Sequence, residues 1–142
     1  MKFVHYHQLD DSDCGATCLR MVSMYYGKHY NLDTLKEKCA QRNQGISMLS
    51  ISKAAEEIGM KTLGVRMDFK QLLKERPFPL IAHWNQEHFV VVIKADRKYI
   101  TIADPVSGIH KLDKETFLKR WISTKKDGLD KGTALLLSRT VL

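Results

Sequence analysis

The pattern of apolar residues changes about half-way along the chain, and this change restricts the possible folds more than any other feature. Up to Gly59 the apolar side chains recur at helical spacing, whereas after Pro77 and Pro79 they form short runs rich in β-branched residues. The four runs are PLIAHW, HFVVVIKA, KYITIAD and TALLLS. Helices followed by strands are typical of an α+β domain, so we predict an N-terminal helical layer packed on a C-terminal antiparallel β-sheet.

Capping signals predict where the helices begin and end. Asp13 can cap a helix that starts at Cys14, and Gly27 is a natural stop just after its expected end near Tyr26. Gly59 closes a later helix in the same way. The expected helices are about 14–26, one that begins near 31 or 33 and includes 39, 48–58, and 113–121 between the third and fourth strands.

A chain of 142 residues has the size of one ordinary domain, so we expect a single domain over residues 1–142. It contains no run of about 18 to 20 apolar residues that would span a bilayer, and residues 1–6 lack the basic start and apolar core of a secretion signal. We therefore expect an intracellular protein. The net charge is +7, but acidic residues are interspersed with the basic ones almost everywhere, which disfavours nucleic-acid binding.

The chain has three cysteines, an odd number without an export signal, so we expect reduced thiols instead of a disulfide framework. Cys14 and Cys18 lie four residues apart near the start of the first expected helix. A zinc site formed by these two with His5 and His7 is one alternative, but the spacing is unusual for structural zinc. We expect no metal and no cofactor, and we interpret Cys18 and Cys39 as small buried residues.

Six histidines could serve a cysteine nucleophile, and the sequence ranks His88 first. If the second and third strands form a hairpin with a three-residue loop centred on Asp96, His88 lies directly opposite Asp104. Directly opposed residues have Cβ atoms roughly 4.5 to 5.5 Å apart, which lets a carboxylate hold an imidazole ring. The loop lacks the glycine that such turns prefer, and a two-residue turn would place Asp104 opposite Phe89 instead. The predicted pair therefore depends on the register of the hairpin.

Cys14 is the candidate nucleophile because it stands at the expected start of a helix. Free N–H groups and the helix dipole favour negative charge there, and the thiolate is the form of cysteine that attacks. A protonated His88 would complete a thiolate and imidazolium pair, with Asp104 fixing the ring. The side-chain amide of Gln8 and the backbone N–H of Cys14 could form an oxyanion hole, and Gly15 leaves room for a substrate backbone.

These residues resemble the papain-like cysteine peptidase domain of peptidase-containing ABC transporters, a family that processes bacteriocins and other leader-bearing peptides. The resemblance covers nearly the whole chain and rests on Gln8, Asp13-Cys14-Gly15, GISMLSIS at 45–52, HFVVV at 88–92 and Asp104-Pro105. It implies a papain-like fold. It also implies that Cys14, His88, Asp104 and Gln8 are the nucleophile, the base, the ring-orienting carboxylate and the oxyanion glutamine, respectively.

The resemblance further implies a substrate and partners. Members of the family cut a leader from a secreted peptide precursor, usually after a Gly-Gly pair, on the cytoplasmic side of the membrane while ATP hydrolysis drives export. They are fused to or associated with membrane and ATPase domains, so this chain is either an excised domain or a free-standing enzyme. Two alternatives remain open: a module that binds a leader without cutting it, and a papain-like peptidase or amidase with another peptide substrate. Some relatives have lost the cysteine, and the presence of Cys14 favours activity.

Overall fold

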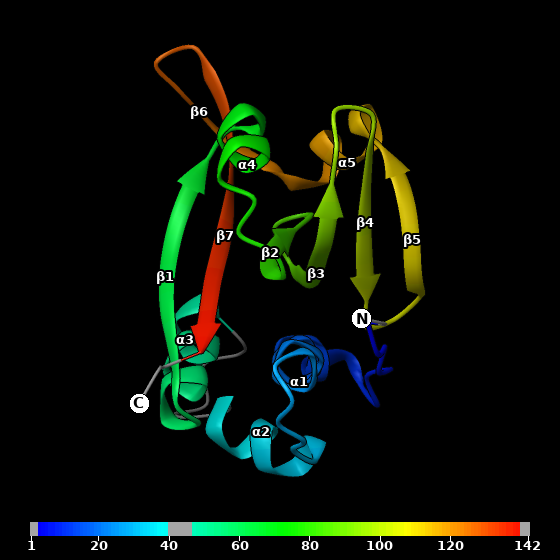
Figure 1. Cartoon of the computed structure of the whole chain (residues 1–142), viewed down its shortest axis with the longest axis vertical. Coiled ribbons are helices and arrows are strands. Elements are labelled where there is room, and N and C mark those ends of the chain that lie inside the picture. Colours follow the sequence, from blue (N-terminus) through cyan, green and yellow to red (C-terminus); the bar gives the residue numbers. More distant parts are fainter. Residues whose placement is uncertain (1–2, 40–46, 140–142) are drawn as a thin grey trace.

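The computed structural model describes residues 3–39 and 47–139 of the chain. A short 3-10 helix, η1 (Asp11–Asp13), leads directly into α1 (Cys14–Tyr25), which is followed by α2 (Leu32–Cys39) and α3 (Met48–Glu57). Figure 1 shows these helices gathered on one side of a β-sheet, as the sequence predicts. Within the described ranges, no helix combines the length and apolar character that crossing a membrane would require.

The described residues form a seven-stranded sheet in which every pair of neighbouring strands is antiparallel. Its strands are β1 (Met60–Met67), β2 (Leu80–Trp84), β3 (His88–Ala95), β4 (Tyr99–Asp104), β5 (Gly108–Asp113), β6 (Ile122–Lys126) and β7 (Leu129–Arg139). They are ordered β1-β7-β2-β3-β4-β5, and β6 pairs with β7. The four predicted runs correspond to β2, β3, β4 and the greater part of β7, which confirms the α+β fold.

The patterns in the sequence do not predict β1, β5, β6 or α4 (Phe69–Glu75). β1 and β5 end the strand order, and partly buried residues alternate with exposed ones along β5. Such edge strands need apolar residues on one face only, so they lack a continuous apolar run. α4 has a signal that could have been recognised, because Asp68 and Gln71 form a capping box at its start. The predicted helix 113–121 is confirmed as α5 (Lys114–Trp121), with Asp113 as its N-cap.

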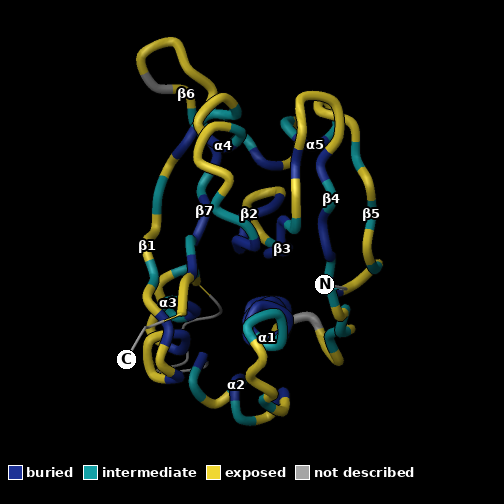
Figure 2. The backbone as a smooth tube through the Cα atoms, in the orientation of Figure 1, coloured by how far each residue is buried: buried dark blue, intermediate teal, exposed yellow. Residues whose placement is uncertain are grey.

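Helices cover both faces of the sheet, so β3 is buried on both sides. Phe89 and Val91 belong to the apolar cluster that contains the buried residues of α1, α2 and α3. Val90 and Val92 belong to a second cluster, which includes Phe117 of α5 and also residues of α4. Figure 2 shows much of β3 and α1 as buried. Packing from both sides fixes β3, and with it His88 as the first residue of that strand.

The register predicted for the β3–β4 hairpin is wrong. With His88 opposite Asp104, the predicted register places Val92 opposite Ile100. In the structure Val92 pairs with Ile102 instead, and a bulge follows between Val92 and Lys94. The turn needs no glycine, because Asp96 Oδ1 accepts the backbone N–H groups of Lys98 and Tyr99, each at 2.8 Å. Side chains alternate with a period of two along a strand, so the shift of two residues up to Val92 keeps the side chains of that part of β3, including His88, on their predicted face. Beyond the bulge the shift is three residues, so Lys94 and Ala95 exchange faces relative to the prediction.

Gly132 in β7 is a position where packing excludes a side chain. A Cβ at this position would overlap the indole ring of Trp121, and that ring is only 1% exposed. A rigid ring inside a close-packed core cannot move aside without displacing its other neighbours. We expect Gly132→Ala to lower the free energy of unfolding by about 3 kcal/mol, measured by urea denaturation.

Gly64→Ala is the matched control for Gly132→Ala. Gly64 lies in the adjacent strand β1, and a Cβ there has no atom within 4 Å. We expect this variant to change the free energy of unfolding by less than about 1 kcal/mol. Equal stabilities of the two variants would show that the contact with Trp121 does not limit position 132.

Candidate active site

Cys14 is the first residue of α1 and is 5% exposed. The preceding turn, η1, is closed by a capping box between Asp10 and Asp13. Asp13 occupies the N-cap position of α1, but the prediction that its side chain caps this helix is wrong, because it makes no such hydrogen bond. Its Oδ2 instead accepts the backbone N–H of Asp10 at 3.1 Å, and its Oδ1 lies 3.2 Å from Nζ of Lys36. The carboxylate is therefore directed to other partners than the first turn of α1.

The predicted contact between His88 and Asp104 is present despite the different register. His88 begins β3 and Asp104 ends β4, and His88 Nε2 lies 2.8 Å from Asp104 Oδ1. The same Oδ1 accepts the backbone N–H of Val106 at 2.9 Å. The side chains of His88 and Asp104 are 23% and 14% exposed, respectively. The carboxylate of Asp104 interacts with Nε2 and fixes the orientation of the ring, so Nδ1 is the ring nitrogen that remains for another partner.

The environment stabilises the charged forms of this pair. Burial lowers the pKa of His88, but the hydrogen bonds and charges of Asp104 and Cys14 outweigh it and raise that pKa to about 9. Burial has the opposite effect on Asp104 and raises its pKa, but hydrogen bonds from His88 and from the backbone N–H of Val106 outweigh burial and lower that pKa to about 2. Asp104 and Cys14 thus favour the protonated form of His88, and His88 in turn favours the ionised form of Asp104.

All three cysteines are free and buried, and Cys14 is the one of them that helps to raise the pKa of His88. Cys18, one turn further along α1, donates its S–H to the carbonyl oxygen of Phe89 at 3.3 Å. Burial, together with the neighbouring charges of Cys14 and Asp104, raises the pKa of Cys18 well above its usual value. Burial likewise raises the pKa of Cys39 to about 12. Both remain thiols at neutral pH, in agreement with their interpretation as small buried residues.

The N-terminal segment runs past the end of β4, and the backbone of Gln8 is bound there. Its backbone N–H donates to the carbonyl oxygen of Pro105 at 2.9 Å, and one side-chain N–H donates to the carbonyl oxygen of Asp10 at 2.9 Å. His5 reinforces this arrangement, since its Nε2 lies 2.6 Å from the carbonyl oxygen of Asp104. The Gln8 amide has two N–H donors, so one remains for another acceptor.

The structure does not gather the proposed zinc ligands. In residues 3–39 and 47–139, no group of three or more histidine, cysteine, aspartate or glutamate side chains is arranged to bind a metal ion. The rings of His5 and His7 contact each other, with centroids 4.6 Å apart. His5 nevertheless interacts with the backbone of Asp104, and Cys18 with that of Phe89. These residues thus serve the contacts between the N-terminal region and the sheet.

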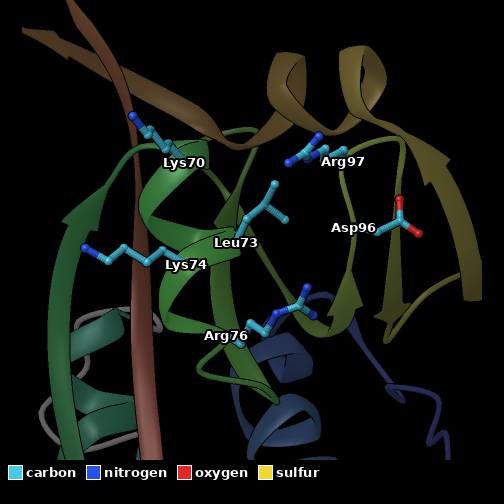
Figure 3. Close-up of a pocket in the computed structure, with 6 residues that line it drawn as sticks. All are labelled: Lys70, Leu73, Lys74, Arg76, Asp96 and Arg97. Carbon is cyan, nitrogen blue, oxygen red and sulfur yellow. The ribbon is translucent and has the colours of Figure 1, made fainter.

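A basic cavity lies at the other end of the β3–β4 hairpin from His88 and Asp104. Figure 3 shows this cavity, which has a volume of about 350 Å³. It is lined by Lys70, Leu73, Lys74, Arg76, Asp96 and Arg97. Neither a thiol nor an imidazole is among these side chains, so this cavity does not provide the chemistry of the site around Cys14.

The sequence matches the model of the peptidase C39 family over residues 2–125. The chain belongs to this family. Over 131 residues this C39 domain is 38% identical to the transport/processing ATP-binding protein ComA of Streptococcus pneumoniae. This alignment covers 85% of this chain and 18% of that relative. Over 111 residues it is 33% identical to the colicin V secretion/processing ATP-binding protein CvaB of Escherichia coli, covering 77% and 16%, respectively. The chain thus spans less than a fifth of the length of these relatives.

Solved structures confirm the papain-like peptidase fold of the C39 domain. A double glycine motif protease from an AMS/PCAT transporter, crystallised in complex with the leader peptide, has a TM-score of 0.85 and 33% identity, covering 98% of this chain and 93% of that one. The peptidase domain of Streptococcus ComA shares the fold at a TM-score of 0.80 and 24% identity, covering 98% and 100%. The resemblance to leader-processing domains of ABC transporters is confirmed. Of its GISMLSIS segment, Gly45 and Ile46 lie outside the described residues.

Proposed function

We propose that this C39 domain is a cysteine endopeptidase in which Cys14 is the nucleophile, His88 the base and Asp104 the carboxylate that orients the ring. The observation that supports this most strongly is the 2.8 Å contact of His88 Nε2 with Asp104 Oδ1, in a pair whose histidine also contacts Cys14. With its pKa raised to about 9, His88 supplies a cation that favours the Cys14 thiolate at neutral pH.

The reaction proceeds in two steps, acylation of Cys14 and hydrolysis of the resulting thioester. The Cys14 thiolate attacks the carbonyl carbon of the peptide bond, and its negative charge passes to the carbonyl oxygen. The second N–H of the Gln8 amide and the backbone N–H of Cys14 stabilise this oxyanion. When the tetrahedral intermediate collapses, His88 donates its proton to the leaving amine and a thioester remains. His88 then takes a proton from water, the hydroxide displaces the thiolate, and the acid product leaves.

The substrate we propose is the leader of a secreted peptide precursor, such as a bacteriocin precursor, cut after a Gly-Gly pair. A neighbour that is 33% identical over 98% of this chain is a double glycine motif protease crystallised with its leader peptide. Selection of glycine requires a channel too narrow for a Cβ, which acts as a steric filter and contributes little affinity. The remainder of the leader must therefore supply most of the binding free energy.

We propose further that the domain acts at the cytoplasmic side of a membrane, attached to or associated with the membrane and ATPase domains of an ABC transporter. The relatives ComA and CvaB are transport or secretion and processing ATP-binding proteins, and the region similar to this chain is less than a fifth of each. Processing next to the transporter would deliver the mature peptide directly for export.

The test is incubation of the domain with a synthetic leader peptide that contains Gly-Gly, followed by mass spectrometry. We expect one cut, directly after the second glycine, and a loss of cleavage of at least about 100-fold when that pair is replaced by Ala-Ala. The Ala-Ala peptide is the matched control, because it keeps the rest of the leader. Binding of the leader without any cut would favour the alternative of a docking module, and a cut elsewhere would favour another peptide substrate.

A further inference from the structure

One lysine of α2 connects that helix to the loop in front of Cys14. Lys36 places its Nζ 3.2 Å from Oδ1 of Asp13 and 3.9 Å from Oδ2 of Asp10. The Asp13 side chain is 0% exposed, whereas that of Lys36 is 37% exposed. A carboxylate withdrawn from water needs a partner of opposite charge. Lys36 is thus the counterion of the residue that immediately precedes Cys14.

The same network continues from Asp13 to Gln8. Oδ2 of Asp13 accepts the backbone N–H of Asp10 at 3.1 Å. The carbonyl oxygen of Asp10 accepts the backbone N–H of Asp13 at 3.1 Å and a side-chain N–H of Gln8 at 2.9 Å. Consecutive polar contacts therefore lead from Lys36 on α2 to the amide of Gln8.

We propose that Lys36 is a positioning residue of the active site, which acts through the buried carboxylate of Asp13 to favour the Cys14 thiolate and to orient the amide of Gln8. The inference deepens the proposed function and rests on it, because an attacking Cys14 is what gives both effects a role in catalysis. Lys36 has two effects, an electrostatic one on the Cys14 sulfur and a geometric one on the Gln8 amide.

The electrostatic effect follows from the position of Asp13 in the chain. Without Lys36, its carboxylate would be an unneutralised charge in the residue next to Cys14, whose sulfur must itself become negative. Like charges repel strongly where water is excluded. The contact also raises the pKa of Lys36, so its ammonium stays charged around neutral pH. The titratable groups that act on or with Cys14 from the packed elements are His88 of β3, Asp104 of β4 through His88, Cys18 of α1 and Cys39 of α2.

The geometric effect follows from the hydrogen bonds of Asp10. If Asp13 loses its counterion, its carboxylate gains from turning towards water, and this change weakens its bond to the N–H of Asp10. Asp10 is the residue whose carbonyl oxygen binds Gln8. A looser Asp10 would therefore let the Gln8 amide leave the position that the oxyanion requires.

The test compares Lys36→Met with Lys38→Met. Lys38 lies on the same helix, is similarly exposed at 32%, and pairs with Glu57 of α3 at 3.3 Å, so its removal deletes the same charge without touching Asp13. We expect Lys36→Met to lower kcat for leader cleavage by about 10-fold to 30-fold with KM changed less than about twofold. Lys36→Arg keeps the positive charge and should retain most of the kcat of the unaltered domain. Lys38→Met should have the same kcat as the unaltered domain.

A second readout requires no substrate. The rate of Cys14 alkylation by iodoacetamide is measured against pH, and mass spectrometry assigns the modified residue. We expect Lys36→Met to move the midpoint of this profile up by about one pH unit, and Lys38→Met to leave it in place. Adding Asp13→Asn to Lys36→Met removes the unneutralised charge, so the midpoint should return towards its original value.

Circular dichroism and urea denaturation establish that each variant is folded. Should Lys36→Met fail to fold, Lys36→Gln takes its place, because glutamine still donates a hydrogen bond to Asp13 and should shift the midpoint in the same direction. The proposal is overturned if the alkylation midpoint moves no further in the Lys36 variant than in Lys38→Met. Absence of cleavage by the unaltered domain would instead reject the proposed function. The alkylation profiles would still show whether Lys36 affects the ionisation of Cys14, because they require no substrate.

Discussion

Cys14→Ala is expected to lower kcat/KM for leader cleavage at least about 10,000-fold, because it removes the atom that forms the thioester. Cys14→Ser should be similarly inactive, since a hydroxyl beside an imidazolium stays protonated where a thiol ionises. Initial rates with the Gly-Gly leader peptide, followed by chromatography, measure both variants. Leader binding should persist in both, because the nucleophile supplies little of the affinity.

Cys18→Ala is the matched control for Cys14→Ala. Cys18 is also buried in α1, one turn further on, and its sulfur bonds to the backbone of β3. We expect this variant to lose some stability through a small cavity while keeping kcat within about threefold. Full activity of Cys14→Ala would exclude thiol catalysis at this position. Loss of activity in Cys18→Ala alone would show that Cys18, and not Cys14, is the nucleophile.

Asp104→Ala is expected to lower kcat by about 100-fold to 1,000-fold. The variant loses the acceptor that lies 2.8 Å from His88 Nε2, so the ring can turn away from Cys14. It also loses the negative charge that helps to keep His88 protonated. The matched control is Asp96→Ala at the other end of the same hairpin, where the carboxylate likewise accepts backbone N–H groups. Cleavage by the Asp96 variant should stay within about twofold of that by the unaltered domain.

Asp104→Asn separates the charge of this residue from its role as an acceptor. The amide oxygen can still accept the ring N–H, so the loss of kcat at neutral pH should be smaller than for alanine. His88 must be protonated to donate to the leaving amine, so activity should fall as pH rises through its pKa of about 9. Burial, the largest influence on that pKa, lowers it, so without the carboxylate the alkaline limb should move down by about one to two pH units. A limb unchanged between pH 7 and 10 would show that Asp104 does not set the protonation of His88.

The fold was predictable wherever an element is buried strongly enough to leave a pattern. β3 is covered on both faces and reads as an unbroken apolar run, and α1 is bounded by Asp13 and Gly27. The edge strands β1 and β5 bury less and are mixed in composition, so their patterns resemble those of loops. The register of the β3–β4 hairpin was not predictable, because it depends on the turn closed by Asp96 and on the bulge after Val92, and the pattern of apolar residues indicates neither.

The chemistry of the candidate site followed from the sequence, whereas its supporting contacts did not. The positions of Cys14 and His88 indicated a thiol and an imidazole on separate elements, and the pairing of His88 with Asp104 survived a register error of two residues. No spacing rule connects Lys36 with Asp13, because they lie on α2 and η1, with α1 and a loop between them.

The sequence by itself determined the fold class, the candidate nucleophile at a helix start, and the histidine and aspartate on neighbouring strands. These features depend on local periodicity and residue type, which can be recognised within short segments of the chain. Only the tertiary structure decided which cysteine contacts the histidine, which carboxylate is neutralised by which lysine, and where Gln8 lies. These depend on how α1, α2 and the sheet pack together, since burial, distance and the pKa of His88 arise from atoms far apart in the chain.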